Sequence, residues 1–174
     1  MSDQQSSLYQ QAGEQFAPAI ARLARAMERD AGKARDLEQD IHLELWRSFA
    51  RFDGECSLKT WVFRVAHNVA ADHVGRAMRQ PTTTDIEEAG HLSAADAGEG
   101  AQADRHAMDR VRAIIRTLPL LDAQVILLWL EGHSGADIAE VTGLTSGAVA
   151  TRISRLKDQV ALKFNTSIGG ARHD

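Results

Sequence analysis

The sequence has a single cysteine, Cys56, and only 5% of its residues are aromatic. One thiol can form neither an internal disulfide nor a cysteine-rich zinc site, so we expect no redox chemistry and no metal. No apolar run approaches the ~20 residues of a membrane-spanning helix, and the start MSDQQSSLYQQ lacks the basic and apolar regions of a signal peptide. We therefore expect a cytoplasmic protein without stable membrane insertion.

Catalytic constellations are also missing. No serine, cysteine or carboxylate grouping has the pattern of an active site, and no glycine-rich phosphate loop is present. The histidines form no H-x-x-x-H motif. The sequence therefore predicts a protein that is not an enzyme and that needs no cofactor.

The net charge of −4 argues against nucleic-acid binding, but the acidic residues are unevenly distributed along the chain. Residues 80–104 hold six of them and no lysine or arginine, which leaves 20 basic and 18 acidic residues elsewhere, a net charge of +2. With Pro81, three consecutive threonines and few large apolar residues, the stretch cannot bury enough surface to offset its ordering entropy. We predict a flexible acidic linker at 80–107 between domains at 1–79 and 108–174.

On both sides of the linker, apolar residues recur at helical spacing, and no β-hairpin signal interrupts them. We therefore expect an all-α fold of two small helical domains. The expected buried stripes of the first domain are Phe16, Ile20, Leu23 and Met27, then Leu37, Ile41, Leu45, Trp46 and Phe49, then Leu58, Trp61, Val62, Val65 and Val69. The polar side of its last helix is expected to show Arg64, His67, Asn68, Asp72, His73 and Arg76.

Residues 134–156 have the pattern of a helix-turn-helix. Ser134 and Asp137 form an S-x-x-D capping box that predicts a helix start, and Gly143 stands where a helix end favours left-handed geometry. Thr145 can cap a second helix, which has one packing face and one polar, basic face. Its packing residues are Val149, Ile153 and Leu156. Such a helix fits the DNA major groove, and the alternative is an ordinary helical hairpin.

Carboxylates recur in the second helix of the first domain. Asp36, Asp40 and Glu44 are spaced four residues apart, with Glu38 nearby, so they form a row along one helix surface. Like charges at this spacing repel each other. The row is either a solvated face or a surface that docks onto a basic helix of a partner.

Two segments resemble a known protein family. Residues 36–76, DLEQDIHLELWRSFARFDGECSLKTWVFRVAHNVAADHVGR, resemble the second conserved domain of bacterial RNA polymerase sigma factors, in particular the extracytoplasmic-function subgroup. Residues 118–155, LPLLDAQVILLWLEGHSGADIAEVTGLTSGAVATRISR, resemble the fourth domain of that subgroup. The resemblance covers about 12–79 and 108–164, and a linker in place of the middle domain is typical of the subgroup. Two motifs in the right order are more specific than one.

The resemblance implies a transcription initiation factor that binds core RNA polymerase and directs it to promoter DNA. By position, the residues that would grip the clamp helices of the largest polymerase subunit are Asp36, Leu37, Gln39, Asp40 and Leu43. The helix before the helix-turn-helix has a family counterpart that meets the polymerase flap, although we assign its apolar residues to the core: Leu118, Leu121, Val125, Leu128 and Trp129. The resemblance also admits an anti-sigma factor as a partner.

The turn and helix from residue 52 onward match the part of the family that captures a flipped base of the minus-ten element and meets the upstream duplex. A small polar loop beside an apolar wall suits this role, because hydrogen bonds and packing must offset unstacking of about a few kcal/mol. The matched residues are Phe52, Asp53, Gly54, Glu55, Cys56, Ser57, Lys59, Val65, Asn68, Asp72, His73, Arg76 and Arg79. On the later turns, the two arginines are the expected phosphate partners.

The second helix of the helix-turn-helix matches the family's recognition helix for the minus-thirty-five element. The matched residues are Thr145, Ser146, Gly147, Ala148, Ala150, Thr151, Arg152, Arg155 and Lys157. The early residues are small and offer few bidentate base contacts, so Arg152 and Arg155 are expected to carry more of the binding. Ala150 stands where the subgroup commonly has lysine, which gives DNA shape a larger part in recognition.

Two further interpretations concern the linker and the other functional classes. The linker acids Asp85, Glu87, Glu88, Asp96 and Glu99 would occupy basic nucleic-acid channels of the polymerase, or the linker is a plain tether. The main alternative function is a stand-alone helix-turn-helix regulator whose N-terminal domain senses a signal or dimerises. A third alternative is a helical adaptor that sequesters another factor without contacting DNA.

Overall fold

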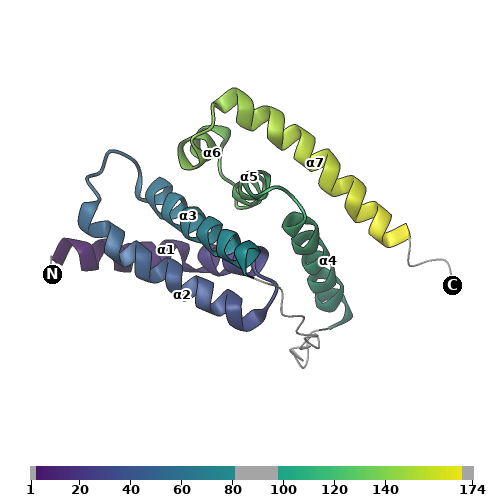
Figure 1. Cartoon of the computed structure of the whole chain (residues 1–174), viewed down its shortest axis with the longest axis horizontal. Helices are drawn as coiled ribbons and strands as arrows, with labels where there is room; N and C mark the ends of the chain where they lie inside the picture. Colours follow the sequence, from purple (N-terminus) through teal and green to yellow (C-terminus); the bar gives the residue numbers. More distant parts are fainter. Residues whose placement is uncertain (1–2, 81–97, 170–174) are drawn as a thin grey trace.

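The computed structural model describes residues 3–80 and 98–169, which form helices and contain no strand (Figure 1). The N-terminal unit (3–80) contains α1 (Asp3–Met27), α2 (Ala31–Ser48), the 3-10 turn η1 (Phe49–Arg51) and α3 (Leu58–Arg79). The C-terminal unit (98–169) contains α4 (Glu99–Arg116), α5 (Leu120–Leu130), α6 (Gly135–Thr142) and α7 (Ser146–Gly169). The predicted all-α fold is confirmed.

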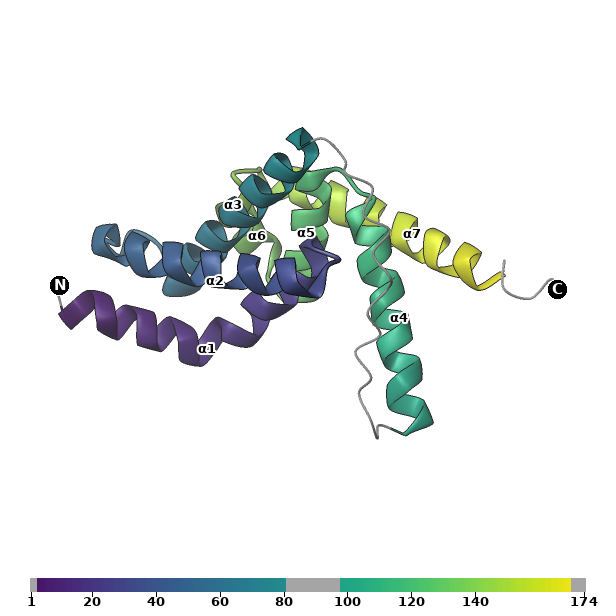
Figure 2. The same ribbon diagram turned by 60° about the horizontal axis from the view of Figure 1, so that its bottom comes forward.

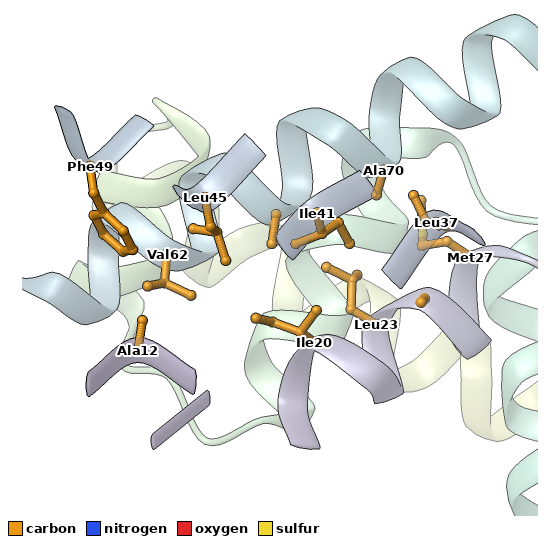
Figure 3. Close-up of a cluster of buried hydrophobic side chains, with 12 residues drawn as sticks. Ala12, Ile20, Leu23, Met27, Leu37, Ile41, Leu45, Phe49, Val62 and Ala70 are labelled. Carbon is orange, nitrogen blue, oxygen red and sulfur yellow. The ribbon is translucent and has the colours of Figure 1, made fainter. Parts of the chain in front are cut away.

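In the N-terminal unit, α1, α2 and α3 pack around one apolar cluster (Figure 3). Local signals set the helix starts: the side chain of Asp30 accepts a hydrogen bond from Lys33 N at 2.7 Å, and Ser57 Oγ accepts one from Thr60 N at 3.0 Å. Such caps each stabilise a helix by about 1 kcal/mol. The largest fully buried side chains of the cluster are Ile20, Leu37, Ile41, Leu45 and Val62. Each of them contributes roughly 1.5–3 kcal/mol of hydrophobic free energy.

Helix α1 begins at Asp3, earlier than the apolar stripe from Phe16 onward indicates. Its first turns are anchored by a polar contact that periodicity does not reveal: Gln5 is buried, and its Nε2 donates to the carbonyl oxygen of Trp46 at 2.7 Å. Pro18 lies inside the helix without ending it. The apolar stripe from Phe16 onward does not show this start, because a buried glutamine takes part in anchoring the first turns to α2.

The helix-turn-helix prediction is confirmed in geometry. Ser134 and Asp137 form both halves of the capping box at the start of α6, and Gly143 ends that helix with φ of +77°. At the start of α7, Ala148 N donates to Thr145 Oγ1 at 3.2 Å. Val149 and Leu156 are fully buried, as the expected packing face requires.

The predicted linker extends too far. Helix α4 begins at Glu99, so residues 99–107 are helical although they were assigned to the linker. Alanines with high helix propensity continue the helix beyond its packed part, and Glu99 lies in the first turn, where a negative charge favours the helix dipole. The linker acids Asp85, Glu87, Glu88 and Asp96 lie outside the described residues.

The two units pack directly against each other, with α1 beside α4 and α3 beside α6 (Figures 1 and 2). The ring of Phe63 lies edge-on to those of Phe16 and His133, with centroids 5.7 and 4.3 Å apart. Arg22 donates two hydrogen bonds to the carboxylate of Glu131, at 2.6 and 2.8 Å. Helix periodicity, which treats each helix by itself, did not predict this packing.

Within these same two units, no helix combines the length and the apolar character that crossing a membrane requires. Over 3–80 and 98–169, histidine, cysteine and carboxylate side chains also form no group of three or more that could hold a metal ion.

Candidate nucleic-acid and partner interfaces

Helix α2 presents most of the residues expected to bind the polymerase. Asp36, Gln39, Asp40 and Leu43 are exposed on its outer surface. Leu37 is fully buried, because it lies in the same helical row as Ile41 and Leu45, which form the core. In this arrangement Leu37 belongs to the core rather than to a contact surface, and it holds the helix in place.

A groove of about 500 Å³ runs between α2 and α3, and we call it the α2–α3 groove. It brings two residues of the acidic row, Asp40 and Glu44, to the same concave surface as part of the predicted minus-ten set. Those minus-ten residues are Val65, Asn68, Asp72 and Arg76. The arginines that line the groove are Arg47, Arg51, Arg64 and Arg76. The groove is thus mixed in charge, with cations beside the predicted polymerase-binding carboxylates.

At one end of the groove, the loop 52–57 is small and polar beside an aromatic wall. Gly54 has φ of +80°, which favours glycine, and Asp53 Oδ1 accepts a hydrogen bond from Glu55 N at 3.1 Å. The Phe52 ring lies edge-on to Trp61 at 5.2 Å, and Trp61 Nε1 donates to Ser48 Oγ at 2.9 Å. The loop is therefore small and polar beside an apolar wall, and its part in holding an unstacked base stays a prediction.

Two histidines of α3 are less accessible than expected. His73 Nε2 lies 2.8 Å from Glu28 Oε2, so this side chain ties α3 to the end of α1. His67, predicted on the polar side, is only 4% exposed, and Gln124 of α5 donates to its carbonyl oxygen at 3.0 Å. Burial, helped by nearby His133, lowers the pKa of His67 to about 3. The C-terminal unit buries this histidine, which explains why the pattern of α3 alone misplaced it.

The first turns of α3 are contacted by α6, and we call this the α3–α6 contact. Lys59 Nζ lies 3.5 Å from Asp137 Oδ2. Thr60 Oγ1 donates to Glu140 Oε2 at 3.1 Å, and Arg64 Nη2 donates to the carbonyl oxygen of Glu140 at 2.9 Å. In this arrangement, a predicted minus-ten residue, Lys59, and its neighbours face acidic groups of the helix-turn-helix.

The start of α7 exposes small residues: Thr145, Ser146, Gly147, Ala150 and Thr151 are exposed and Ala148 is half-buried. Its cations are not free. Arg152 and Arg155 both donate to the carboxylate of Asp122 in α5, and Lys157 Nζ lies 5.3 Å from the centre of the Trp129 ring. Trp129 is 38% exposed, so its assignment to the core is wrong. Sequence reasoning missed Asp122, although a lone acid in the apolar segment LLDAQVILLWL was a signal.

Comparisons with known proteins place both units in one family. Residues 14–80 match Sigma-70 region 2, and residues 108–169 match Sigma-70 region 4. The ECF RNA polymerase sigma factor SigC of Mycobacterium tuberculosis is 32% identical over 74% of this chain and 69% of its own length. The ECF RNA polymerase sigma-E factor of Haemophilus influenzae is 31% identical over 74% of this chain and 73% of its own length.

Solved structures agree in fold. The sigma factor RpoE of Bartonella quintana, in complex with the anti-sigma factor NepR, is 22% identical with a TM-score of 0.69, over 90% of this chain and 96% of that chain. CnrH in complex with the cytosolic domain of CnrY gives a TM-score of 0.67 at 22% identity, over 91% of this chain and 88% of that one. With both sigma regions matched in order and relatives above 30% identity, this chain belongs to the extracytoplasmic-function subgroup of the RNA polymerase sigma factors.

Proposed function

We propose that this protein is a transcription initiation factor that binds core RNA polymerase, directs it to a class of promoters and aids melting of the minus-ten region. One observation carries the proposal: both sigma regions are present in order, the first with the α2–α3 groove and the second with a complete helix-turn-helix. Sigma factors are generally initiation factors that act by binding. We propose that this one likewise performs no catalysis and acts in the cytoplasm.

The exposed side of α2 is the proposed polymerase-binding surface. Asp36, Asp40 and Glu44 form its carboxylate row, and exposed Leu43 lies beside Asp40 at the α2–α3 groove. Carboxylates around an exposed leucine match a partner surface that has basic groups around an apolar contact, as the clamp helices of the family's polymerase would provide. Leu37 and Ile41, buried beneath, keep the row in a fixed position.

The loop 52–57 and the α2–α3 groove are the proposed minus-ten surface. The aromatic wall of Phe52 and Trp61 can pack against an unstacked base, and base–aromatic stacking contributes about 1–3 kcal/mol. Arg76 and Arg79 are exposed near the end of α3, where they can meet phosphates of the upstream duplex.

Promoter binding on this proposal requires the two units to separate. The α3–α6 contact pairs Lys59, Thr60 and Arg64 with groups of α6, so on this proposal α6 leaves α3 to release them for DNA. Each hydrogen bond of the contact contributes only about 0.5–1.5 kcal/mol net, which polymerase binding can replace. Because the structurally similar RpoE of Bartonella quintana was solved in complex with the anti-sigma factor NepR, we propose that an anti-sigma factor would hold the closed arrangement.

The test is run-off transcription with purified core polymerase from the host, with and without this protein, on a pool of genomic promoter fragments. We expect selective new transcripts that disappear with Asp40→Arg, because the reversed charge repels a basic partner surface. Asp104→Arg, the same change at an exposed position of α4, is the matched control and should leave the transcripts unchanged.

Two other outcomes would contradict the proposal. If no transcripts appear while the protein alone shifts duplex DNA, the stand-alone helix-turn-helix regulator becomes the better interpretation. If the protein binds another factor equally well after Arg152 and Arg155 are replaced, and neither transcribes nor binds DNA, it is a helical adaptor.

A further inference from the structure

A buried carboxylate lies behind the DNA-facing helix of the helix-turn-helix. Asp122 belongs to the first turn of α5, beside α7 (Figure 1), and its side chain is 10% exposed. One oxygen, Oδ1, accepts a hydrogen bond from Arg152 Nη1 at 2.5 Å and another from Arg155 Nη2 at 3.2 Å. The other, Oδ2, lies 3.1 Å from the same Arg155 Nη2. A single carboxylate thus holds two arginines that are three residues apart on α7.

Both arginines keep donors for a ligand. A guanidinium has five N–H groups, and the contacts with Asp122 use one terminal nitrogen of each arginine. The side chain of Arg152 is 32% exposed and that of Arg155 is 51% exposed. One negative charge against two positive charges leaves the group with a net positive charge. Each guanidinium is therefore fixed at one end and open to an anion or a base edge at the other.

Fixing an arginine before DNA arrives changes what it can recognise. An unattached arginine side chain carries about 2 kcal/mol of rotamer entropy, which it loses when DNA orders it. An unattached arginine can also follow a phosphate in many positions, and so binds duplexes with little regard to sequence. The start of α7 has small residues such as Ser146, Gly147 and Ala150, so the two fixed arginines that follow provide the main directed donors of the helix.

We propose that Asp122 is a positioning residue that gives the recognition helix its sequence discrimination, by holding Arg152 and Arg155 in one direction. The inference rests on the proposed function, in which α7 reads the minus-thirty-five element. Without the carboxylate, the arginines swing toward the nearest phosphates. Binding to any duplex then strengthens, while the preference for the correct sequence weakens.

The variant that tests this is Asp122→Asn, which removes the charge and keeps the shape. Holoenzyme reconstituted from host core polymerase is measured on promoter fragments enriched by the wild-type holoenzyme, and on the same fragments with the minus-thirty-five segment scrambled. We expect the ratio of the two dissociation constants to fall about tenfold, the discrimination of one lost bidentate contact. The slope of log affinity against log salt should steepen by roughly one to two, since each released arginine neutralises another phosphate.

Two controls separate positioning from a general loss of structure. Asp109→Asn removes a carboxylate from another arginine pair, in which Arg112 Nη1 lies 3.1 Å from Asp109 Oδ1 on α4, and it should change neither the ratio nor the slope. The second control adds Asp122→Asn to an Arg155→Gln variant. Asp122→Asn should then lower the ratio of dissociation constants less than it does in the wild type, because Arg155, which Asp122 holds, is already missing.

Three results would contradict the inference. An unchanged ratio and salt slope in Asp122→Asn overturn the inference. A uniform loss of affinity for both fragments together with a lowered melting temperature also overturns it, because Asp122 then only stabilises the fold. If the wild-type holoenzyme itself does not enrich any promoter fragment, the proposed function fails, and the inference that depends on it fails with it.

Discussion

The minus-ten surface and the recognition helix both carry charged groups proposed for DNA, but these groups are held by different parts of the molecule. Lys59 of the minus-ten set is contacted across the interface by α6, which belongs to the other unit and also contacts the neighbouring Thr60 and Arg64. Arg152 and Arg155 of α7 are contacted by Asp122 within their own unit. Separation of the units would therefore release Lys59 from its acidic partner and leave the arginines of α7 unchanged.

This difference shows that one chain can make two DNA-facing surfaces that respond differently to a partner. On the proposed function, polymerase binding separates the units and releases Lys59 from the α3–α6 contact. The recognition helix keeps its arginines in place whether the units are together or apart. The arrangement of the two units thus affects the minus-ten surface, whereas contacts within the C-terminal unit fix the arginines of the recognition helix.

The largest expected effects come from the cores beneath the two surfaces. Leu156→Ala and Leu45→Ala each remove a fully buried side chain, from the C-terminal and the N-terminal apolar cluster respectively, and should each lower the free energy of unfolding by about 2–5 kcal/mol. Urea titrations give the values. Leu156→Ala should impair the recognition helix first and Leu45→Ala the polymerase-binding surface, and identical losses of both in each variant would contradict the separation described here.

The interface between the two units contains a buried histidine, so the free energy of unfolding should depend on pH. Burial holds the pKa of His67 at about 3, below its ordinary value of 6.5, so the closed arrangement favours the neutral imidazole. This stabilisation is complete above pH 6.5 and is lost as the pH falls from there toward 3, by roughly 1.4 kcal/mol per pH unit. His133, whose pKa is also lowered by burial, adds to the effect.

The measurement is the free energy of unfolding at several pH values below neutrality, for the wild type and for His67→Leu. The leucine variant cannot be protonated, so its stability should fall less steeply with acid. Equal slopes for the two proteins would show that the pKa of His67 does not differ between the folded and unfolded states. That result would contradict the burial of His67 by the C-terminal unit.

A smaller effect is expected at the α3–α6 contact itself. Glu140→Lys removes the acceptor of Thr60 Oγ1 and places a cation beside Lys59 and Arg64, which should weaken the contact by roughly 1 kcal/mol. Lys59 should then react faster with an amine-specific acylating reagent, measured by peptide mass spectrometry. Lys33, on α2, is the internal reference, and an unchanged ratio of the two rates would contradict the contact.

The smallest effect concerns the ion pair between Arg22 and Glu131. Its geometry is bidentate, but the arginine side chain is largely exposed, so Arg22→Ala should cost less than about 1 kcal/mol. The cost should decrease further as salt is added, because exposed charges are screened. Thermal melting at low and high salt tests this, and a large, salt-independent loss would mean that Arg22 also packs in the interface.

The helix-turn-helix could be predicted in detail because its signals are local. The capping box at Ser134, the left-handed Gly143 and the cap at Thr145 each depend on a few neighbouring residues. The buried stripes of α1 and α2 follow from the helical period for the same reason. Low hydrophobicity predicts no structure for residues 99–107, but alanine propensity and the charge of Glu99 extend α4 there.

The parts that could not be predicted depend on the other unit or on another helix. His67 has the pattern of a polar-face residue, and only α5 and its neighbours bury it. Asp122 holds Arg152 although thirty residues separate them, so no local pattern reveals the pair. Leu37 was carried into the contact set by family position, while its helical row with Ile41 already indicated the core.

The central claim, that the α3–α6 contact engages Lys59 in the free chain and is released for initiation, can be tested by one zero-length cross-link. Carbodiimide joins a lysine amine to a contacting carboxylate as an amide, and Lys59 Nζ lies 3.5 Å from Asp137 Oδ2. The chain has only four lysines, so few products compete. Lys59→Arg keeps the charge, cannot form the amide and is the control.

We expect the Lys59–Asp137 cross-link in the free protein, its loss in the initiating complex of polymerase and promoter, and no run-off transcripts from the cross-linked protein. An equal yield of the cross-link in the free protein and in the initiating complex, or full transcription from the cross-linked protein, would contradict the account.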